Sequence, residues 1–151
     1  MRLLYTNKIG FRKFYPCENK TGEETSRPVR TFIETVDSPY YIHSDNHGKF
    51  KEGLFKKLMR NFGVHRIFAE PHSPWQNRAE SVIGEVMTYA RNLTQKTNTP
   101  IQLWCFCYEY AADLMCLLAN GCFDLQDRTP YMVVLYYTPY ISECMSYTWF
   151  P

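Results

Sequence analysis

Residues 40–80 read YYIHSDNHGKFKEGLFKKLMRNFGVHRIFAEPHSPWQNRAE, and their apolar and polar residues alternate as expected for strands and helices. A short buried strand is predicted at Tyr40–Ile42, ending at the turn residues His43-Ser44-Asp45-Asn46. A second strand is predicted at Val64–Ala69. The segment therefore predicts two strands separated by one helix and followed by another, which is typical of an α/β fold.

An amphipathic helix is predicted between these strands, because apolar residues recur there at every fourth position. The apolar residues are Phe50, Leu54, Leu58 and Phe62, with Phe55 and Met59 beside them. Basic residues occupy other positions of the same helix: Lys49, Lys51, Lys56, Lys57 and Arg60. Asn61-Phe62-Gly63 is expected to end the helix, with Gly63 at its C-cap.

A longer helix is predicted to start at Ser73-Pro74-Trp75-Gln76, which has the form of a capping box. An apolar stripe follows at helical spacing: Ala79, Val82, Ile83, Val86, Met87, Ala90 and Leu93. Glu80 and Gly84 lie off this stripe. Asn98-Thr99-Pro100 is expected to end the helix and to start another over Ile101–Leu118, which is apolar on nearly every side and is therefore predicted to be buried.

The remaining segments complete a mixed pattern of strands and helices. Leu3–Tyr5 and Phe11–Tyr15 are separated by Asn7–Gly10 and suggest a hairpin. Pro28 is expected in the first turn of a helix that runs to about Val36. Thr129-Pro130 is expected to start a short helix through Leu135. The whole order predicts a mixed sheet with helices packed on it.

Composition excludes two classes of protein. The 151 residues are 45% hydrophobic and 17% aromatic, which is enough apolar mass for a packed core and excludes a disordered chain. No apolar run approaches the roughly 18 residues that span a bilayer, and the N-terminus turns polar too soon for a signal peptide. The six cysteines are therefore expected to be reduced intracellular thiols, and Cys105, Cys107, Cys116 and Cys122 lack the paired spacing of a zinc site.

The net charge of +2 hides an uneven distribution of charge. Residues 1–100 hold 16 of the 17 Lys and Arg and 10 of the 15 Asp and Glu, a balance of +6. Residues 101–151 carry a balance of −4. A basic first part suits a polyanionic partner, and it is equally compatible with a chance asymmetry of a solvated surface.

Two carboxylates stand out by position. Asp45 follows a predicted strand, where ligand-binding groups gather in α/β sheets, and Glu80 lies in the first turns of the long helix. Two carboxylates brought together are the minimum for holding a divalent cation such as Mg2+. Simple structural roles remain open, because Asp forms turns and Glu favours the N-terminus of a helix.

Three motifs in this region resemble the catalytic core of retroelement integrases, in particular those of copia-type retrotransposons. They are residues 43–50, Phe62-Gly63-Val64 and Pro71-His72-Ser73-Pro74-Trp75-Gln76-Asn77-Arg78-Ala79-Glu80. Members of this family carry two Asp and one Glu on a ribonuclease-H-like fold, with the second Asp and the Glu about 35 residues apart, a spacing suited to paired metal ligands. Asp45 and Glu80 are 35 positions apart, and residues 10–20 and 128–131 resemble flanking parts of such cores.

The resemblance implies a role for each matching residue. Asp45 and Glu80 would be the second and third metal-binding carboxylates, with Mg2+ or Mn2+ as the cofactor. Nucleic-acid contacts are implied for Asn46, Lys49, Trp75, Gln76, Asn77 and Arg78. Trp75 is equally compatible with a role as an apolar anchor of the helix. For Arg78 a phosphate contact is favoured over a merely solvated position.

The first catalytic Asp of the family falls near Asn7 in this sequence. Either Asn7 replaces it, or the start of the domain lies upstream of Met1. An Asn offers a neutral oxygen where a bridging carboxylate is needed, so two Mg2+ ions would be poorly neutralised. We therefore expect a ribonuclease-H-like mixed sheet flanked by helices that is N-terminally truncated or degenerate, and catalytically weak or inactive.

The function implied is DNA integration by metal-dependent strand transfer. The alternative is a non-catalytic remnant or a co-opted domain that binds DNA or protein. A ribonuclease acting on RNA–DNA hybrids shares the fold, but the Pro74–Glu80 motif argues against it. Residues 1–119 are expected to form the core-like domain, and residues 120–151 a C-terminal extension packed on it. The expected partners are element DNA, target DNA and further copies of the chain. The protein is expected in the nucleus if it is functional, and no association with a membrane is expected.

Overall fold

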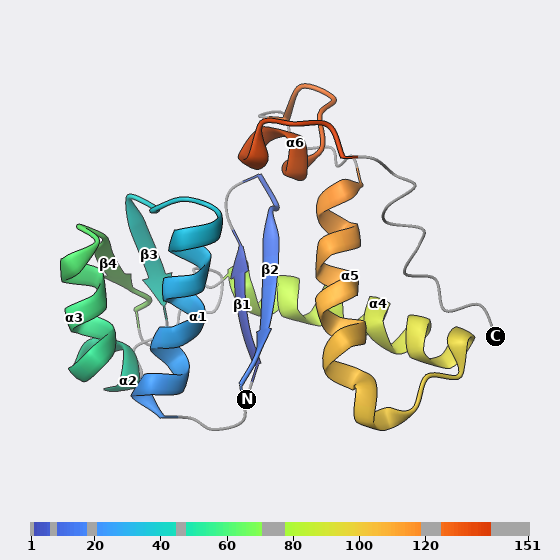
Figure 1. Ribbon diagram of the computed structural model, residues 1–151, viewed down its shortest axis with the longest axis horizontal. Coiled ribbons are helices and arrows are strands. Elements are labelled where there is room, and N and C mark those ends of the chain that lie inside the picture. The colour runs from blue at the N-terminus through green and yellow to red at the C-terminus, as the bar shows by residue number, and fades with distance from the viewer. Residues whose placement is uncertain are drawn as a thin grey trace. The chain divides into compact units, whose positions relative to one another are not determined.

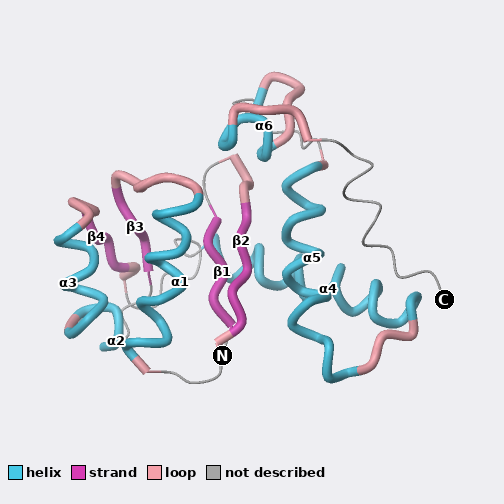
Figure 2. Tube along the Cα trace, in the orientation of Figure 1, coloured by secondary structure: helices cyan, strands magenta, loops and turns pink. Residues whose placement is uncertain are grey.

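A computed structural model of the chain describes residues 2–6, 9–17, 21–44, 48–70, 78–118 and 125–139 (Figure 1). The elements are β1 (Arg2–Thr6), β2 (Arg12–Pro16), α1 (Gly22–Thr35), β3 (Tyr41–Ser44), α2 (Gly48–Lys51), α3 (Gly53–Asn61), β4 (His65–Phe68), α4 (Arg78–Thr97), η2 (Ile101–Leu103), α5 (Trp104–Leu117) and α6 (Pro130–Leu135). Helix is the main structure of the described residues, and the strands form two pairs (Figure 2). The predicted mixture of helices and strands is confirmed. The single mixed sheet that the sequence predicts is not observed among the described residues, where β1 pairs with β2 and β3 pairs with β4 in two separate sheets.

The chain divides into two compact units. The first unit holds Met1–Leu3 and Tyr15–Ser81, and the second holds Leu4–Phe14 and Val82–Pro151. The predicted boundary between residues 119 and 120 lies outside the described residues and stays a prediction. In the described part of the chain, no helix combines the length and the hydropathy needed to cross a membrane.

β1 and β2 form a two-stranded sheet, as the sequence predicts. Residues 7–11 connect them, and this connection is far shorter than the dozen or so residues that a parallel crossover needs. The pair is therefore a hairpin.

A parallel strand pair and three helices form most of the first unit. β3 and β4 pair in parallel, with Tyr41 opposite His65 and Ser44 opposite Phe68. The chain between them forms α2 and α3, so this segment is a strand–helix–strand crossover. α3 packs on both α1 and β4. The buried side chains of these helices include Val29 and Ile33 of α1 and Phe55, Leu58 and Met59 of α3.

α1 begins earlier than predicted, at Gly22, and the expected position of Pro28 in its first turn is wrong. The Thr21 hydroxyl caps the helix by accepting a hydrogen bond from Glu24 N at 3.3 Å. Pro28 lies inside the helix and has no N–H to donate to the Glu24 carbonyl four residues earlier. The Cys17 thiol donates to that carbonyl at 3.6 Å and so occupies the acceptor that proline leaves open.

The single helix predicted between β3 and β4 is wrong, because the structure has two short helices, α2 and α3. The break falls at Glu52, whose backbone is extended, and at Gly53, whose φ of +72° favours glycine. The break changes the buried face: Phe55, Leu58 and Met59 are buried, whereas Leu54 is 52% exposed. The predicted end of the helix is confirmed, because Gly63 has a φ of +66° and donates to the Arg60 carbonyl.

The strand predicted at Tyr40–Ile42 exists as β3, but it is not buried. Tyr40 is 77% and Tyr41 52% exposed. Side chains of a strand alternate between two faces, and in β3 only Ile42 and Ser44 lie on the more covered one. A tyrosine tolerates water through its hydroxyl group, and the Tyr40 ring lies 5.0 Å from the ring of His65.

The core of the second unit is built on the predicted apolar stripe of α4. Val82, Val86 and Ala90 of that stripe are buried. They belong to one cluster of buried residues together with Phe14, Cys107, Tyr108, Ala111 and Ala112. The ring of Phe14 lies 5.4 Å from that of Tyr108. The stripe is therefore confirmed, and Glu80 and Gly84 lie off it and are exposed, as predicted.

The helix predicted at Ile101–Leu118 is buried on one face only. A 3-10 turn, η2, precedes α5, and Ile101, Phe106 and Leu118 are 72%, 63% and 55% exposed. Cys107, Tyr108, Ala111, Ala112 and Cys116 form the fully buried face of α5, whereas Trp104 and Met115 are only partly buried against the same core and Phe106 is exposed. The prediction of a helix buried on nearly every side is therefore wrong.

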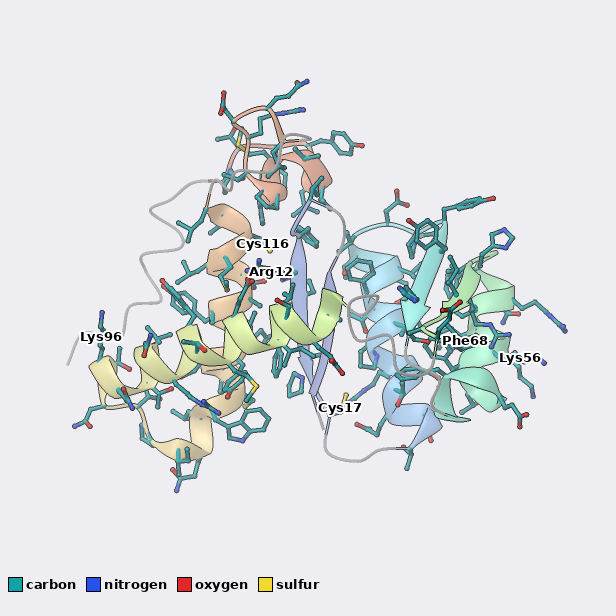
Figure 3. The ribbon with its side chains drawn as sticks, turned by 180° about the vertical axis from the view of Figure 1, so that it is seen from behind. Arg12, Cys17, Lys56, Phe68, Lys96 and Cys116 are labelled. Carbon is teal, nitrogen blue, oxygen red and sulfur yellow. The ribbon has the colours of Figure 1, made fainter. Side chains whose placement is uncertain are left out.

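Cys116 joins β2 to α5 through the backbone of Arg12 (Figure 3). Arg12 N donates to the sulfur at 3.0 Å, and the thiol donates to the Arg12 carbonyl at 3.1 Å. Burial raises the pKa of the Cys116 thiol to about 11, so it stays protonated near neutral pH. Cys107 and Cys116 are buried free thiols, and Cys105 is a half-buried one.

Charged residues of β2 strengthen the same junction. The Arg12 guanidinium pairs with Glu85 of α4 at 2.9 Å, and Lys13 pairs with Asp113 of α5 at 2.8 Å. Burial of Glu109, together with the nearby charge of Asp113, raises the pKa of the Glu109 carboxyl above its ordinary value.

α6 starts at Pro130 as predicted, with the Thr129 hydroxyl accepting a hydrogen bond from Met132 N at 3.2 Å.

Candidate metal and nucleic-acid site

The carboxyl ends of β3 and β4 meet at one edge of their sheet. Ser44 pairs with Phe68, and Ala69 N donates to the Ser44 carbonyl at 2.9 Å, so the two strands end side by side. Ligands of open α/β sheets bind at this edge. Asp45 is the next residue after Ser44 in the sequence, although it lies outside the described residues.

Glu80 lies in the first turn of α4 and is exposed. Its neighbours on the helix divide by face: Val82 is buried in the second unit's core, whereas Ser81 is exposed as Glu80 is. Within the described part of the chain, no ion pair engages the Glu80 carboxylate. Glu80 is therefore an exposed carboxylate at the start of a helix.

Arg66 holds α2 against β4, and the sequence alone did not single it out. Its Nη1 atom donates to the Phe50 carbonyl at 3.2 Å, and its guanidinium lies 5.6 Å from the centre of the Phe68 ring. α2 begins three residues after Asp45, so this contact fixes the segment that leaves the carboxyl edge. The alternation of side chains along a strand could have indicated this role, because Arg66 and Phe68 share one face of β4 and alternate with the exposed His65 and Ile67.

Most of the residues predicted to bind nucleic acid or metal lie outside the described residues. These are Asn7, Asp45, Asn46, Trp75, Gln76 and Asn77. Lys49 lies in α2 and Arg78 at the start of α4, and only their backbone is described. The structure thus places Glu80 and the edge that precedes Asp45, and the joint site of these carboxylates stays a prediction.

The predicted donor set suits Mg2+ in its chemistry, since Asp45 and Glu80 both supply carboxylate oxygens. Glu80 is the one predicted ligand whose side chain the structure describes. The described ranges hold no group of three or more His, Cys, Asp or Glu side chains that could bind a metal ion together. A metal at this edge is therefore a proposal.

No protein-family model matches the sequence of this chain, and no curated protein is detectably similar to it. Solved structures, by contrast, show clear similarity. One is a chain of the simian T-cell lymphotropic virus intasome in complex with PP2A regulatory subunit B56 gamma, with a TM-score of 0.74 at 15% identity over 91% of this chain. Another is the catalytic core domain of BIV integrase, with a TM-score of 0.71 at 16% identity over 97% of this chain.

The two matches differ in extent on the viral side. The match covers 90% of the BIV core domain and 48% of the intasome chain, so the present chain spans about half the length of the latter. At these sequence identities the similarity shows the fold alone. The chain has the α/β fold of retroviral integrase catalytic cores.

Proposed function

We propose that the chain is the catalytic-core domain of a retroelement integrase of the copia type, with ribonuclease-H-like architecture. The observation that carries the proposal is the agreement of two independent features. The fold is that of retroviral integrase cores, and the sequence places Asp45 directly after β3 and Glu80 in the first turn of α4. The substrate class is DNA, namely element ends and a target duplex.

Asp45 and Glu80 hold the divalent cation in this proposal, which is Mg2+ or Mn2+. When bound, such a cation stabilises the charge that develops at a transferring phosphate group. Glu80 contributes an exposed carboxylate at a helix start, and Arg66 keeps the segment after Asp45 in place. Asn46, Lys49, Trp75, Gln76, Asn77 and Arg78 contact the DNA. The protein acts as a homo-oligomer in the nucleus.

Catalysis is impaired in this proposal because Asn7 occupies the place of the first Asp. A neutral amide oxygen leaves one negative charge missing from a site that is built to neutralise cations. The second candidate function is a domain that binds DNA or protein without chemistry, and Asn7 is the observation that favours it. The two candidates differ in turnover and agree on the fold.

A strand-transfer assay tests the proposal. The purified chain is incubated with labelled element-end DNA, a target duplex and Mg2+ or Mn2+. We expect strand transfer that is weak and is lost when Asp45→Asn or Glu80→Gln is introduced. Robust turnover that depends on both carboxylates would contradict the impairment, and turnover that ignores both would contradict the site.

A further inference from the structure

The outer face of α3 carries three cations in a row: Lys56, Lys57 and Arg60. All three are exposed, and Lys56 lies on the outer side of the helix (Figure 3). The opposite face, with Phe55, Leu58 and Met59, is buried inside the first unit, where α3 packs on α1 and β4. Lys56 and Arg60 are four residues apart and therefore lie about 6 Å apart along the helix axis.

This arrangement is unfavourable for the helix itself. Like charges three and four residues apart destabilise a helix, and the first turn of α3 holds no acidic residue to favour the N-terminus. The Glu52 side chain does not cap the helix. Within the described residues, no ion pair links Lys56, Lys57 or Arg60 to a carboxylate. The chain thus presents three cations that nothing described on its own surface neutralises.

The position of α3 relates this face to the carboxyl edge of β3 and β4. α2 and α3 return the chain from the end of β3 to the start of β4, so α3 runs antiparallel to both strands. Its C-terminal end meets β4, where Val64 N donates to the Met59 carbonyl at 2.9 Å. Its N-terminal end therefore lies toward the edge that Asp45 follows. A polyanion laid along α3 would reach that edge.

We propose that the outer face of α3, formed by Lys56, Lys57 and Arg60, binds the phosphate backbone of duplex DNA and leads the duplex to the carboxyl edge of β3 and β4. Charge complementarity selects a polyanion, because backbone phosphates bind to Lys and Arg. Proteins that bind single strands also present aromatic platforms for stacking bases, and the outer face of α3 has none. The choice of DNA rests on the proposed function, whereas the binding face rests on the exposure and charge of α3.

The test compares two triple variants of the full chain by fluorescence anisotropy with a labelled duplex. One variant is K56Q/K57Q/R60Q. The control is R30Q/R91Q/K96Q, which removes the same charge from exposed positions of α1 and α4. Binding is measured in EDTA, so that it does not depend on a metal or on turnover. Circular dichroism verifies that each variant is folded.

We expect the α3 variant to lose at least about tenfold in duplex affinity near 0.1 M salt, and its log–log salt slope to become shallower by about 2 to 3. The control variant R30Q/R91Q/K96Q should keep a duplex affinity close to that of the native chain. The variant K56R/K57R/R60K, which keeps the three positive charges, should also bind the duplex with native affinity. The proposal would be overturned by any of three results. Both glutamine variants could lose duplex affinity equally, or the α3 variant could keep native affinity. The native chain could also bind single-stranded RNA or anionic vesicles more tightly than the duplex. A chain inactive in strand transfer that still shows the α3 effect would refute the proposed catalysis and leave this face standing.

Discussion

Replacing Asn7 by Asp is expected to raise the rate of DNA strand transfer by on the order of 10²- to 10³-fold, comparable to restoring one electrostatic group of an active site. The reason is charge: the proposed site holds the carboxylates Asp45 and Glu80, and in this proposal Asn7 supplies a neutral oxygen where retroelement integrases carry their first Asp. A third carboxylate balances more of the charge of two divalent cations. The measurement is the initial rate of product formation with Mg2+, at equal protein concentration.

The control for this gain is Asn46→Asp, which adds the same charge next to Asp45 without replacing Asn7. We expect this control to give no comparable gain. If Asn7→Asp leaves the rate unchanged, Asn7 does not stand at the position of the first catalytic Asp. A gain that persists after Glu80→Gln is added would show that the restored activity does not use the proposed site.

Phe55→Ala is expected to destabilise the protein by about 3–5 kcal/mol, because it removes a large side chain from a closely packed core. Phe55 is 1% exposed and lies 5.1 Å, ring centre to ring centre, from Phe50 of α2. The matched control is Leu54→Ala at the neighbouring position, which is 52% exposed and should change stability by less than about 0.5 kcal/mol. Urea unfolding followed by circular dichroism measures both. If Phe55→Ala and Leu54→Ala lowered the free energy of unfolding equally, Leu54 would be as buried as the apolar stripe of the sequence predicts.

The same pair of residues shows where sequence periodicity reaches its limit. Apolar residues at every fourth position, Phe50 to Phe62, predicted one continuous stripe that includes Leu54. The extended backbone of Glu52 and the positive φ of Gly53 interrupt the helix, so the buried face begins again at Phe55. A break of this kind depends on how α3 packs on α1 and β4, which no local pattern records.

Local signals that need no tertiary context predicted their elements well. The end of α3 at Gly63, the apolar stripe of α4 and the start of α6 at Pro130 are all confirmed. The start of α1 was missed although Thr21 and Glu24 have capping-box spacing, because Pro28 offered a competing start signal. A proline inside a helix is tolerable only where another donor reaches the freed carbonyl, and here the Cys17 thiol does so.

The sequence predicted the residue types and the spacing of the candidate site, and the joint site of Asp45 and Glu80 stays a prediction. The sequence placed Asp45 after a strand and Glu80 on an exposed position near a helix start, and the structure confirms the strand and the exposure of Glu80. Arg66 was not predictable as a positioning residue, because its bond to the Phe50 carbonyl joins elements that only the fold brings together. The unneutralised cations of α3 likewise required the structure, which shows that no described carboxylate pairs with them.

Joint binding of one divalent cation by Asp45 and Glu80 can be measured by isothermal titration calorimetry of the native chain with Mn2+. The control is Glu23→Gln, which removes an exposed carboxylate from the first turn of another helix, α1. We expect saturable Mn2+ binding that Asp45→Asn and Glu80→Gln each weaken at least about tenfold, as expected for the loss of a metal-site residue, and that Glu23→Gln leaves unchanged. Mn2+ binding that survives both substitutions, or that Glu23→Gln weakens to the same extent, would contradict this joint binding.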